Sequence, residues 1–148
     1  MPTIRFWGFH VDTPDGWEDV TDTVGVDGAP ATIARPDGVG ALQFSVGLYT
    51  GGTRPDPSVE LLLEMLHEFG EARGLGAPGD VVMQVGRLRL VAGLFLPGND
   101  FLRVWYLSDG LSFALVTYVC EAGREAHELA DCERIVRSLT FDAPGQTP

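Results

Sequence analysis

The first half of the chain alternates apolar and polar residues in short runs, and turn-forming residues separate these runs. A period of two residues is typical of strands with one buried face. The pattern predicts short strands over residues 4–6, 9–11, 17–26, 31–35 and 41–48. The turn Pro14-Asp15-Gly16 stands directly before the large apolar Trp17. We expect this turn to reverse the chain and to leave Trp17 largely buried.

Helical spacing replaces the alternation after residue 56. Apolar residues recur three and four positions apart at Val59, Leu62, Leu63, Leu66 and Phe69. This spacing predicts an amphipathic helix over residues 57–73. Asp56 is the expected N-cap, Pro57 the first helical residue and Gly74 the residue that ends the helix. The polar side of this helix is acidic and contains Glu60, Glu64, Glu68 and Glu71.

Four further extended runs and a second helix follow. The runs cover about residues 81–86, 88–96, 101–108 and 112–120. The short turns between them predict an antiparallel meander. The second helix is expected over about 124–137, and residues 143–148 are expected to form a disordered tail. This order predicts one α+β domain over residues 1–142, with two main helices packed on an antiparallel β-sheet.

Composition limits the class of protein and of partner. The chain has 148 residues and a formal net charge of −11, and its basic residues are all Arg, which is typical of a GC-rich bacterial genome. A negative field repels phosphate backbones, so the charge argues against nucleic acid and for a basic partner, although solubility alone would also explain it. No apolar run approaches the roughly 18 residues of a membrane span, and the N-terminus lacks the features of a signal peptide. We therefore expect a cytoplasmic protein.

No catalytic or metal-binding motif stands out. Cys120 and Cys132 have no histidine at ligand spacing, so we expect reduced thiols in the core, while a disulfide between them stays open. His67 and His127 begin the runs HEFGE and HELAD, which lack the second histidine of a zinc-binding helix. The serines occupy no strand-to-helix nucleophile turn. The sequence therefore predicts no metal, no cofactor and no enzymatic activity.

Two candidate partner-binding surfaces remain. The first is acidic, and it combines the helix glutamates with an N-terminal group that includes Asp15, Asp19 and Asp22. Such a surface would steer a basic partner. The second is a sheet face predicted to present Arg89, Arg103 and Trp105, residue types that are enriched in interface hot spots. The alternative for this second surface is that helices cover both faces of the sheet and that its aromatic residues belong to the core.

Two short motifs and the element order resemble those of a known superfamily. The motifs are Pro14-Asp15-Gly16-Trp17 and Arg137-Ser138-Leu139-Thr140-Phe141. With the element order between them, they make most of the chain similar to the Mog/PsbP-like fold, an α/β sandwich. The resemblance implies a binding or assembly protein, because members include photosystem accessory subunits, a Ran-binding factor and bacterial accessory proteins of contact-dependent or type VI secretion systems. The bacterial branch fits the composition best.

These observations lead to two hypotheses of function. The first is an immunity-type protein that binds and neutralises a cognate bacterial toxin through an acidic surface. The second is a secretion chaperone or adaptor of the same fold that binds an apolar segment of an effector on its sheet face. An enzyme would need a pocket with convergent polar groups, and the sequence contains no pattern that predicts one.

Overall fold

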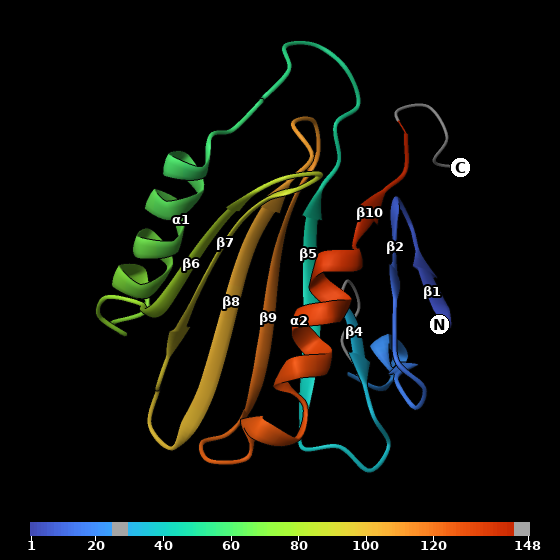
Figure 1. The fold of residues 1–148 in the computed structure, drawn as a ribbon, viewed down its shortest axis with the longest axis vertical. Helices are drawn as coiled ribbons and strands as arrows, with labels where there is room; N and C mark the ends of the chain where they lie inside the picture. The colour runs from blue at the N-terminus through green and yellow to red at the C-terminus, as the bar shows by residue number, and fades with distance from the viewer. Residues whose placement is uncertain (25–29, 144–148) are drawn as a thin grey trace.

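A computed structural model describes residues 1–24 and 30–143 of the chain, and its fold is drawn in Figure 1. Its helices and strands, in chain order, are β1 (Thr3–Phe6), β2 (Phe9–Asp12), β3 (Glu18–Asp19), η1 (Thr21–Val24), β4 (Ala31–Ala34), β5 (Gly40–Gly47), α1 (Val59–Ala72), β6 (Gly79–Val85), β7 (Arg89–Phe95), β8 (Asp100–Ser108), β9 (Phe113–Glu121), η2 (Glu125–His127), α2 (Leu129–Ser138) and β10 (Thr140–Phe141). The labels η1 and η2 denote 3-10 helices.

The strands form two antiparallel sheets. The larger has seven strands in the order β3-β4-β5-β9-β8-β7-β6, and the smaller has three in the order β1-β2-β10. Strands β6 to β9 are consecutive neighbours, as the predicted meander requires. The pairing of β5 with β9 joins the strand before α1 to the last strand of this meander. The predicted α+β class, with two helices on an antiparallel sheet, is therefore confirmed.

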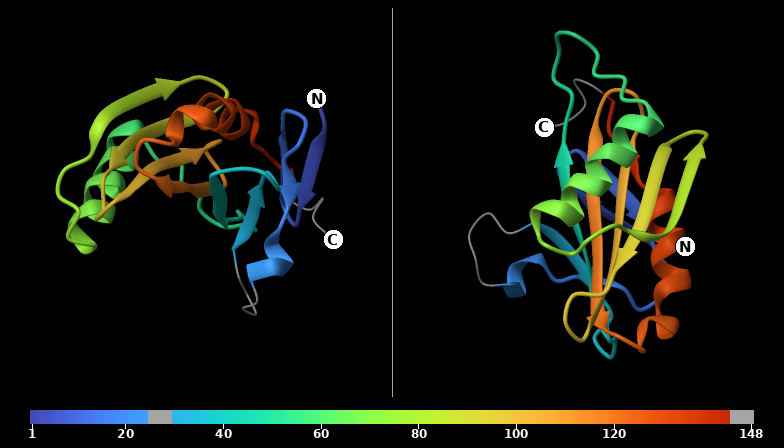
Figure 2. Two further views of the ribbon diagram at one scale, coloured as in Figure 1. Left: turned by 90° about the horizontal axis from the view of Figure 1, so that it is seen from below. Right: turned by 90° about the vertical axis from the view of Figure 1, so that its left-hand side faces the viewer.

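The two long helices pack on opposite faces of the seven-stranded sheet, as the two views in Figure 2 show. The main core lies on the α2 side and includes Trp105, Tyr118 and Ile135. The smaller core lies on the α1 side and includes Leu66 and Tyr106. Paired residues of adjacent antiparallel strands point to the same face, so the register decides which core each side chain enters.

Helix α1 begins two residues later than the sequence predicts. Its N-cap is Ser58, whose side chain accepts a hydrogen bond from the backbone N–H of Leu61. The prediction that Asp56 caps this helix is wrong, because Asp56 has a φ of +41° and its carboxylate binds the guanidinium of Arg89 instead. Gly74 follows the helix with a φ of +68°, a conformation that glycine adopts without strain.

The turn before Trp17 behaves as predicted. Gly16 has a φ of +99°, and Trp17 is 6% exposed within the main core. The indole N–H of Trp17 donates to Asp131 of α2 at 3.3 Å. Trp17 therefore joins the N-terminal segment to the C-terminal helix.

The extended stretch predicted over residues 17–26 is wrong beyond Asp19. The Asp19 carboxylate accepts hydrogen bonds from the backbone N–H and the hydroxyl of Thr21. Such a local side-chain contact favours a turn over a strand, and the 3-10 helix η1 follows. Val26 of this predicted stretch lies outside the described residues.

The second predicted helix is divided in the structure. Residues Glu125–His127 form η2, and α2 begins at Leu129. Glu128 separates them because its backbone φ of −134° is not helical. Of the tail predicted over 143–148, residues 144–148 lie outside the described part of the chain.

Candidate functional site

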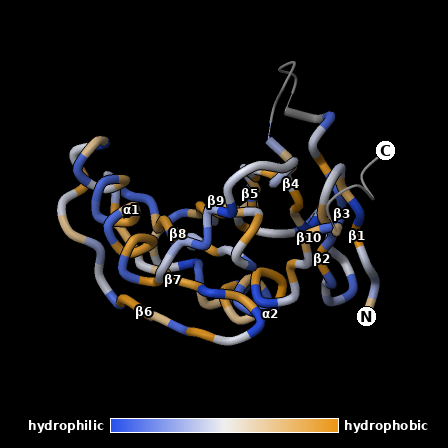
Figure 3. Tube along the Cα trace, turned by 90° about the horizontal axis from the view of Figure 1, so that it is seen from above, coloured by the Kyte–Doolittle hydropathy of each residue, from blue (hydrophilic) through white to orange (hydrophobic). Residues whose placement is uncertain are grey.

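The outward face of α1 is acidic, as predicted. Its exposed residues include Glu60, Glu64, Glu68 and Glu71, which we call the acidic α1 face. None of these four carboxylates takes part in an ion pair with the residues that the structure describes. Figure 3 shows hydrophilic (blue) and hydrophobic (orange) positions alternating along this helix. The face therefore presents unneutralised negative charge to solvent.

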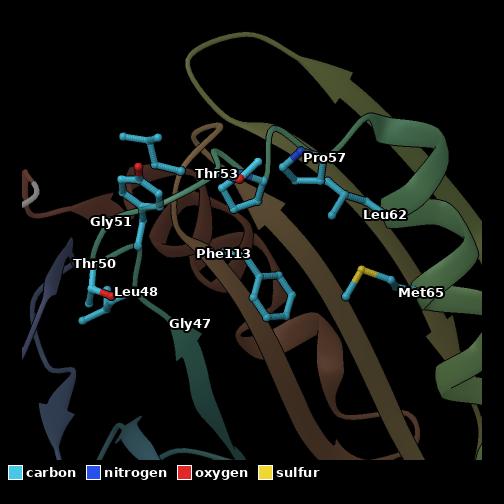
Figure 4. Close-up of a pocket in the computed structure, with 12 residues that line it drawn as sticks. Gly47, Leu48, Thr50, Gly51, Thr53, Pro57, Leu62, Met65 and Phe113 are labelled. Atoms are coloured by element: carbon cyan, nitrogen blue, oxygen red, sulfur yellow. The ribbon is translucent and has the colours of Figure 1, made fainter.

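A pocket of about 360 Å³ lies beside the first half of α1. Figure 4 shows Leu62 and Met65 of α1 on one side of it, Phe113 of β9 below, and Leu48 on the side of the β5–α1 loop. The loop also contributes Pro55 and Pro57. The lining is mostly apolar, which is typical of a site that accepts an apolar group.

Hydrogen bonds and ring stacking hold the walls of this pocket. The backbone N–H of Tyr49 donates to the Ser112 hydroxyl at 2.9 Å, and the Tyr49 hydroxyl donates to the carbonyl of Gly52 at 2.7 Å. The ring of Phe113 stacks on Tyr106 with centroids 6.2 Å apart. The loop between β5 and α1 supplies most of the lining, and its contact with Ser112 attaches it to the turn before β9.

On the α1 side of the sheet, the described residues cover β5 and β9 less completely than β8. In β8, eight of the nine residues are buried, so both faces of that strand are covered. In β9, buried residues alternate with half-buried or exposed ones, so only the α2 face is covered. Strand β5 follows the same alternation through most of its length. The residues of β5 and β9 on this side form what we call the open face: Ser45, Gly47 and Val119 are exposed, and Ala41, Gln43, Phe113, Leu115 and Thr117 are half-buried. Phe113 and Leu115 pack at their inner ends against the α1-side core.

The N-terminal acidic residues form a separate patch. Asp15, Asp19 and Asp22 are exposed, and they lie at or near β3, one edge of the seven-stranded sheet. Helix α1 instead contacts β6, β7 and β8 at the other side of that sheet. The two predicted acidic groups therefore form two separate patches, with β4, β5 and β9 between them in the sheet order.

The predicted second surface is not formed. Trp105 pairs with Ala92 and Arg103 pairs with Leu94, so both point into the α2-side core. Trp105 is 0% exposed and Arg103 is 4% exposed. Arg89 pairs with Ser108 on the opposite face and binds Asp56. The prediction that the three share one exposed face is wrong, and the alternative, in which the aromatic residues belong to the core, is correct.

Arg103 and Trp105 instead help to attach α2 to the sheet. The Glu133 carboxylate of α2 accepts hydrogen bonds from Arg103 Nε at 3.1 Å and from the Trp105 indole N–H at 3.2 Å. Arg137 of α2 forms an ion pair with the same carboxylate. Arg103 also donates to the carbonyl of Asp80 at 3.0 Å. Buried charges are stable only with such partners, so this network has a structural role.

A second buried carboxylate attaches the start of α2 to the sheet. Glu128 is 3% exposed. Its Oε1 accepts from the Tyr118 hydroxyl at 2.9 Å and from the backbone N–H of Gly40 at 3.1 Å. No sequence pattern distinguishes Glu128 or Glu133 from the exposed glutamates, because their role depends on contacts with distant strands.

The structure contains no arrangement that indicates metal chemistry. Among the described residues, no group of three or more His, Cys, Asp and Glu side chains could hold a metal ion. Cys120 and Cys132 are both buried free thiols. No helix in the described part of the chain is long and apolar enough to cross a membrane. The described surface features that remain are the acidic α1 face and the mostly apolar pocket beside it.

Comparison with known proteins identifies the fold. No model of a known protein family matches the chain, and no curated protein matches it. The solution structure of the cyanobacterial PsbP protein CyanoP from Synechocystis sp. PCC 6803 superposes with a TM-score of 0.60 over 91% of this chain and 87% of CyanoP, at 10% identity. The chain has a PsbP-like fold.

A second solved structure shares this fold. A protein from Bacteroides thetaiotaomicron VPI-5482 superposes with a TM-score of 0.61 over 93% of this chain, at 14% identity. The match covers 46% of the Bacteroides protein, so the PsbP-like chain spans about half of its length. At these identities the two comparisons establish architecture alone, and the predicted fold resemblance is confirmed at that level.

Proposed function

We propose that this PsbP-like protein binds and neutralises a basic protein partner, in the manner of an immunity protein for a bacterial toxin. The observation that supports this proposal is the acidic α1 face, with four exposed carboxylates that have no ion-pair partner among the described residues. The net charge of −11 also gives the molecule as a whole a negative electrostatic potential. Basic side chains of a partner would be drawn toward this face.

The spacing of the glutamates adds to this argument. Glu60, Glu64 and Glu68 stand four residues apart, so like charges are neighbours on the helix. Each such pair costs a helix about 0.2–0.5 kcal/mol. Cations from a partner would remove this repulsion. The arrangement therefore gains stability when a basic surface binds to it.

The second candidate is a secretion chaperone or adaptor that binds an apolar segment of an effector. The open face favours it, because Val119 is 42% exposed and Leu115 is only half-buried beside the part of the sheet that α1 covers. Its contact residues would be those of the open face. Arg103 and Trp105 are buried under α2 and would not reach a partner.

Co-expression tests the first candidate. The adjacent open reading frame is expressed in bacteria with either the wild-type protein or the double variant Glu64→Arg/Glu68→Arg. We expect growth arrest by the adjacent gene product, rescue by the wild type and loss of rescue with the double variant. Asp15→Arg/Asp22→Arg is the matched control, since it reverses the same number of charges on the other acidic patch and leaves the Asp19–Thr21 hydrogen bonds in place. Full rescue by the Glu64→Arg/Glu68→Arg variant would contradict the proposal.

A further inference from the structure

The open face lies beside the acidic α1 face, on the same side of the sheet. We propose that an amphipathic helix lies beside α1 across β5 and β9, with its apolar side on the open face and a row of basic residues against Glu64 and Glu68. The inference rests on the proposed function, because it specifies which part of the basic partner is bound. Four observations support it.

The open face is more apolar than a solvated sheet face. An antiparallel sheet with one face in water normally has apolar residues inside and polar residues outside. In β9 the uncovered positions are Phe113, Leu115, Thr117 and Val119, of which only one is polar. On the neighbouring strands β7 and β8, the same layer is covered by α1. A second helix beside α1 would complete the layer that α1 begins.

The backbone of β5 and β9 requires the occupant to be a helix. Both strands are internal, since β5 pairs with β4 and β9, and β9 pairs with β5 and β8. Neither strand offers a free edge, so an extended segment could not add to the sheet here. An occupant on this apolar surface must satisfy its own backbone hydrogen bonds, which an α-helix does.

The dimensions of the open face fit such a helix. Nine residues of β9 extend over about 30 Å, which is the length of a helix of about 20 residues. On β5 the uncovered positions include the small residues Ala41, Ser45 and Gly47. Small side chains let a helix backbone approach closely. The pocket beside Phe113 would then receive one larger apolar side chain at the end of the face.

The negative charge along α1 indicates that the adjacent side of the bound helix is basic. Leu61, Glu64, Met65 and Glu68 are three or four residues apart, so they are neighbours on one side of α1. Met65 lines the pocket and Leu61 is 45% exposed. Glu68 stands three residues after Met65, on the side of α1 that faces the pocket. Carboxylates therefore border the apolar surface, and a second copy of this acidic chain is a poorer occupant than a basic helix.

A designed peptide provides the probe. It is a 20-residue helix of Leu, Ala and Lys with an apolar stripe at i, i+3, i+4 and i+7 and Lys along one flank, and its control is a scrambled peptide of the same composition. Binding to the full chain is measured by fluorescence anisotropy, and the site is located by amide chemical-shift changes. We expect the amphipathic peptide to bind at least ten times more tightly than the scrambled one, with shifts in β5, β9 and α1.

Three variants separate the parts of the inference. Ser45→Trp places a large side chain on the open face, and we expect it to weaken peptide binding at least tenfold. Val85→Trp is its matched control, because Val85 is 75% exposed on the distant edge strand β6, and it should leave the dissociation constant within twofold. Val119→Asn should also weaken binding, because it removes apolar contact without adding bulk.

Other results would overturn the inference in distinguishable ways. Equal binding of the two peptides, or unchanged binding to both Ser45→Trp and Val119→Asn, would place the site elsewhere. If the peptide results contradicted the helix site but Glu64→Arg/Glu68→Arg still abolished rescue in co-expression, the proposed function would be supported and only the helix site would be wrong. Sedimentation of the wild type as a dimer that Ser45→Trp converts to a monomer would assign the open face to a second copy.

Discussion

At the scale of single residues, the buried ionisable groups near α2 determine how stability depends on pH. Cys132 is 0% exposed and Cys120 is 4% exposed. Burial raises the pKa of each thiol above its ordinary value of 9.0, and the nearby carboxylates of Glu128 and other acidic residues raise that of Cys132 further. Burial also raises the pKa of the Tyr118 hydroxyl, which donates to Glu128. The folded protein therefore keeps these groups neutral.

We expect the free energy of unfolding to fall as the pH rises above 9. The unfolded chain releases the thiol protons near pH 9 and the folded chain does not, so the unfolded state binds fewer protons and is favoured. Below pH 9 this stabilisation is fully present. Cys132 should contribute a loss of about 1.4 kcal/mol per pH unit above its ordinary pKa, and Cys120 adds to this loss until the pH reaches its raised pKa in the folded state. Urea unfolding with a reducing agent at pH 7–10.5 measures this slope.

The variant Cys132→Ala tests which group is responsible. Its unfolding curves should lose less stability between pH 9 and 10.5 than those of the wild type, because one titrating thiol is absent. Parallel stability curves for the two proteins would contradict the assignment to Cys132. The quantity compared is the change in unfolding free energy between pH 9 and 10.5 within each protein. A destabilisation by the smaller alanine side chain that is the same at every pH therefore cancels.

At the scale of elements, α2 is held to the sheet by charged groups as well as by its apolar side. Glu133 accepts from Arg103 and Trp105, and it also pairs with Arg137 on its own helix. Arg103 is 4% exposed, so its guanidinium depends on these protein partners. Removing one member of a buried pair leaves the other charge uncompensated.

Glu133→Ala should destabilise the protein by about 3 kcal/mol, because Arg103 and the indole N–H of Trp105 would both lose an acceptor. Thermal or urea unfolding at pH 7 measures the change. Glu64→Ala is the matched control, since that carboxylate is exposed on α1 and has no ion-pair partner among the described residues. We expect the control to change stability by no more than about 0.5 kcal/mol. Equal stability of the two variants would show that the network does not hold α2.

Sequence periodicity predicts these elements because it is a local property. The alternation around Leu42 and Phe44 and the helical spacing from Val59 to Phe69 both correspond to observed elements. Ser58 and Asp56 are both good N-cap residues, so the pattern could not decide between them. Ser58 is the N-cap in the structure, while the Asp56 carboxylate binds Arg89, a residue that is distant in the sequence.

The candidate site was harder to predict than the elements. Arg103 and Trp105 belong to the α2 side because of how β8 pairs with β7. A shift of one residue in this register would move both side chains to the other face. The sequence of a single strand does not determine its register with its neighbour. The acidic α1 face was predictable, because its position follows from the period of one helix. The open face depends on how far α1 extends over the sheet, which is a tertiary property.

At the scale of the whole molecule, charge and uncovered apolar surface lie next to each other. Helix α1 covers β7 and β8, while the neighbouring side of β9 and β5 is only partly buried by the described residues. The acidic α1 face borders this opening, and the chain as a whole has a net charge of −11. Long-range attraction would bring a basic partner to this side of the molecule, and apolar contact would then hold it.

The most direct test is the rate at which the protein associates with the purified product of the adjacent open reading frame. Stopped-flow kinetics compare the wild type with Glu64→Arg/Glu68→Arg at low and high ionic strength. Exposed charges are screened beyond about 8 Å at 0.15 M salt, so the wild-type rate should fall at least tenfold as salt rises, whereas the variant should associate slowly at both concentrations. Equal association rates for the two proteins at low salt would contradict the claim that the acidic α1 face recruits the partner.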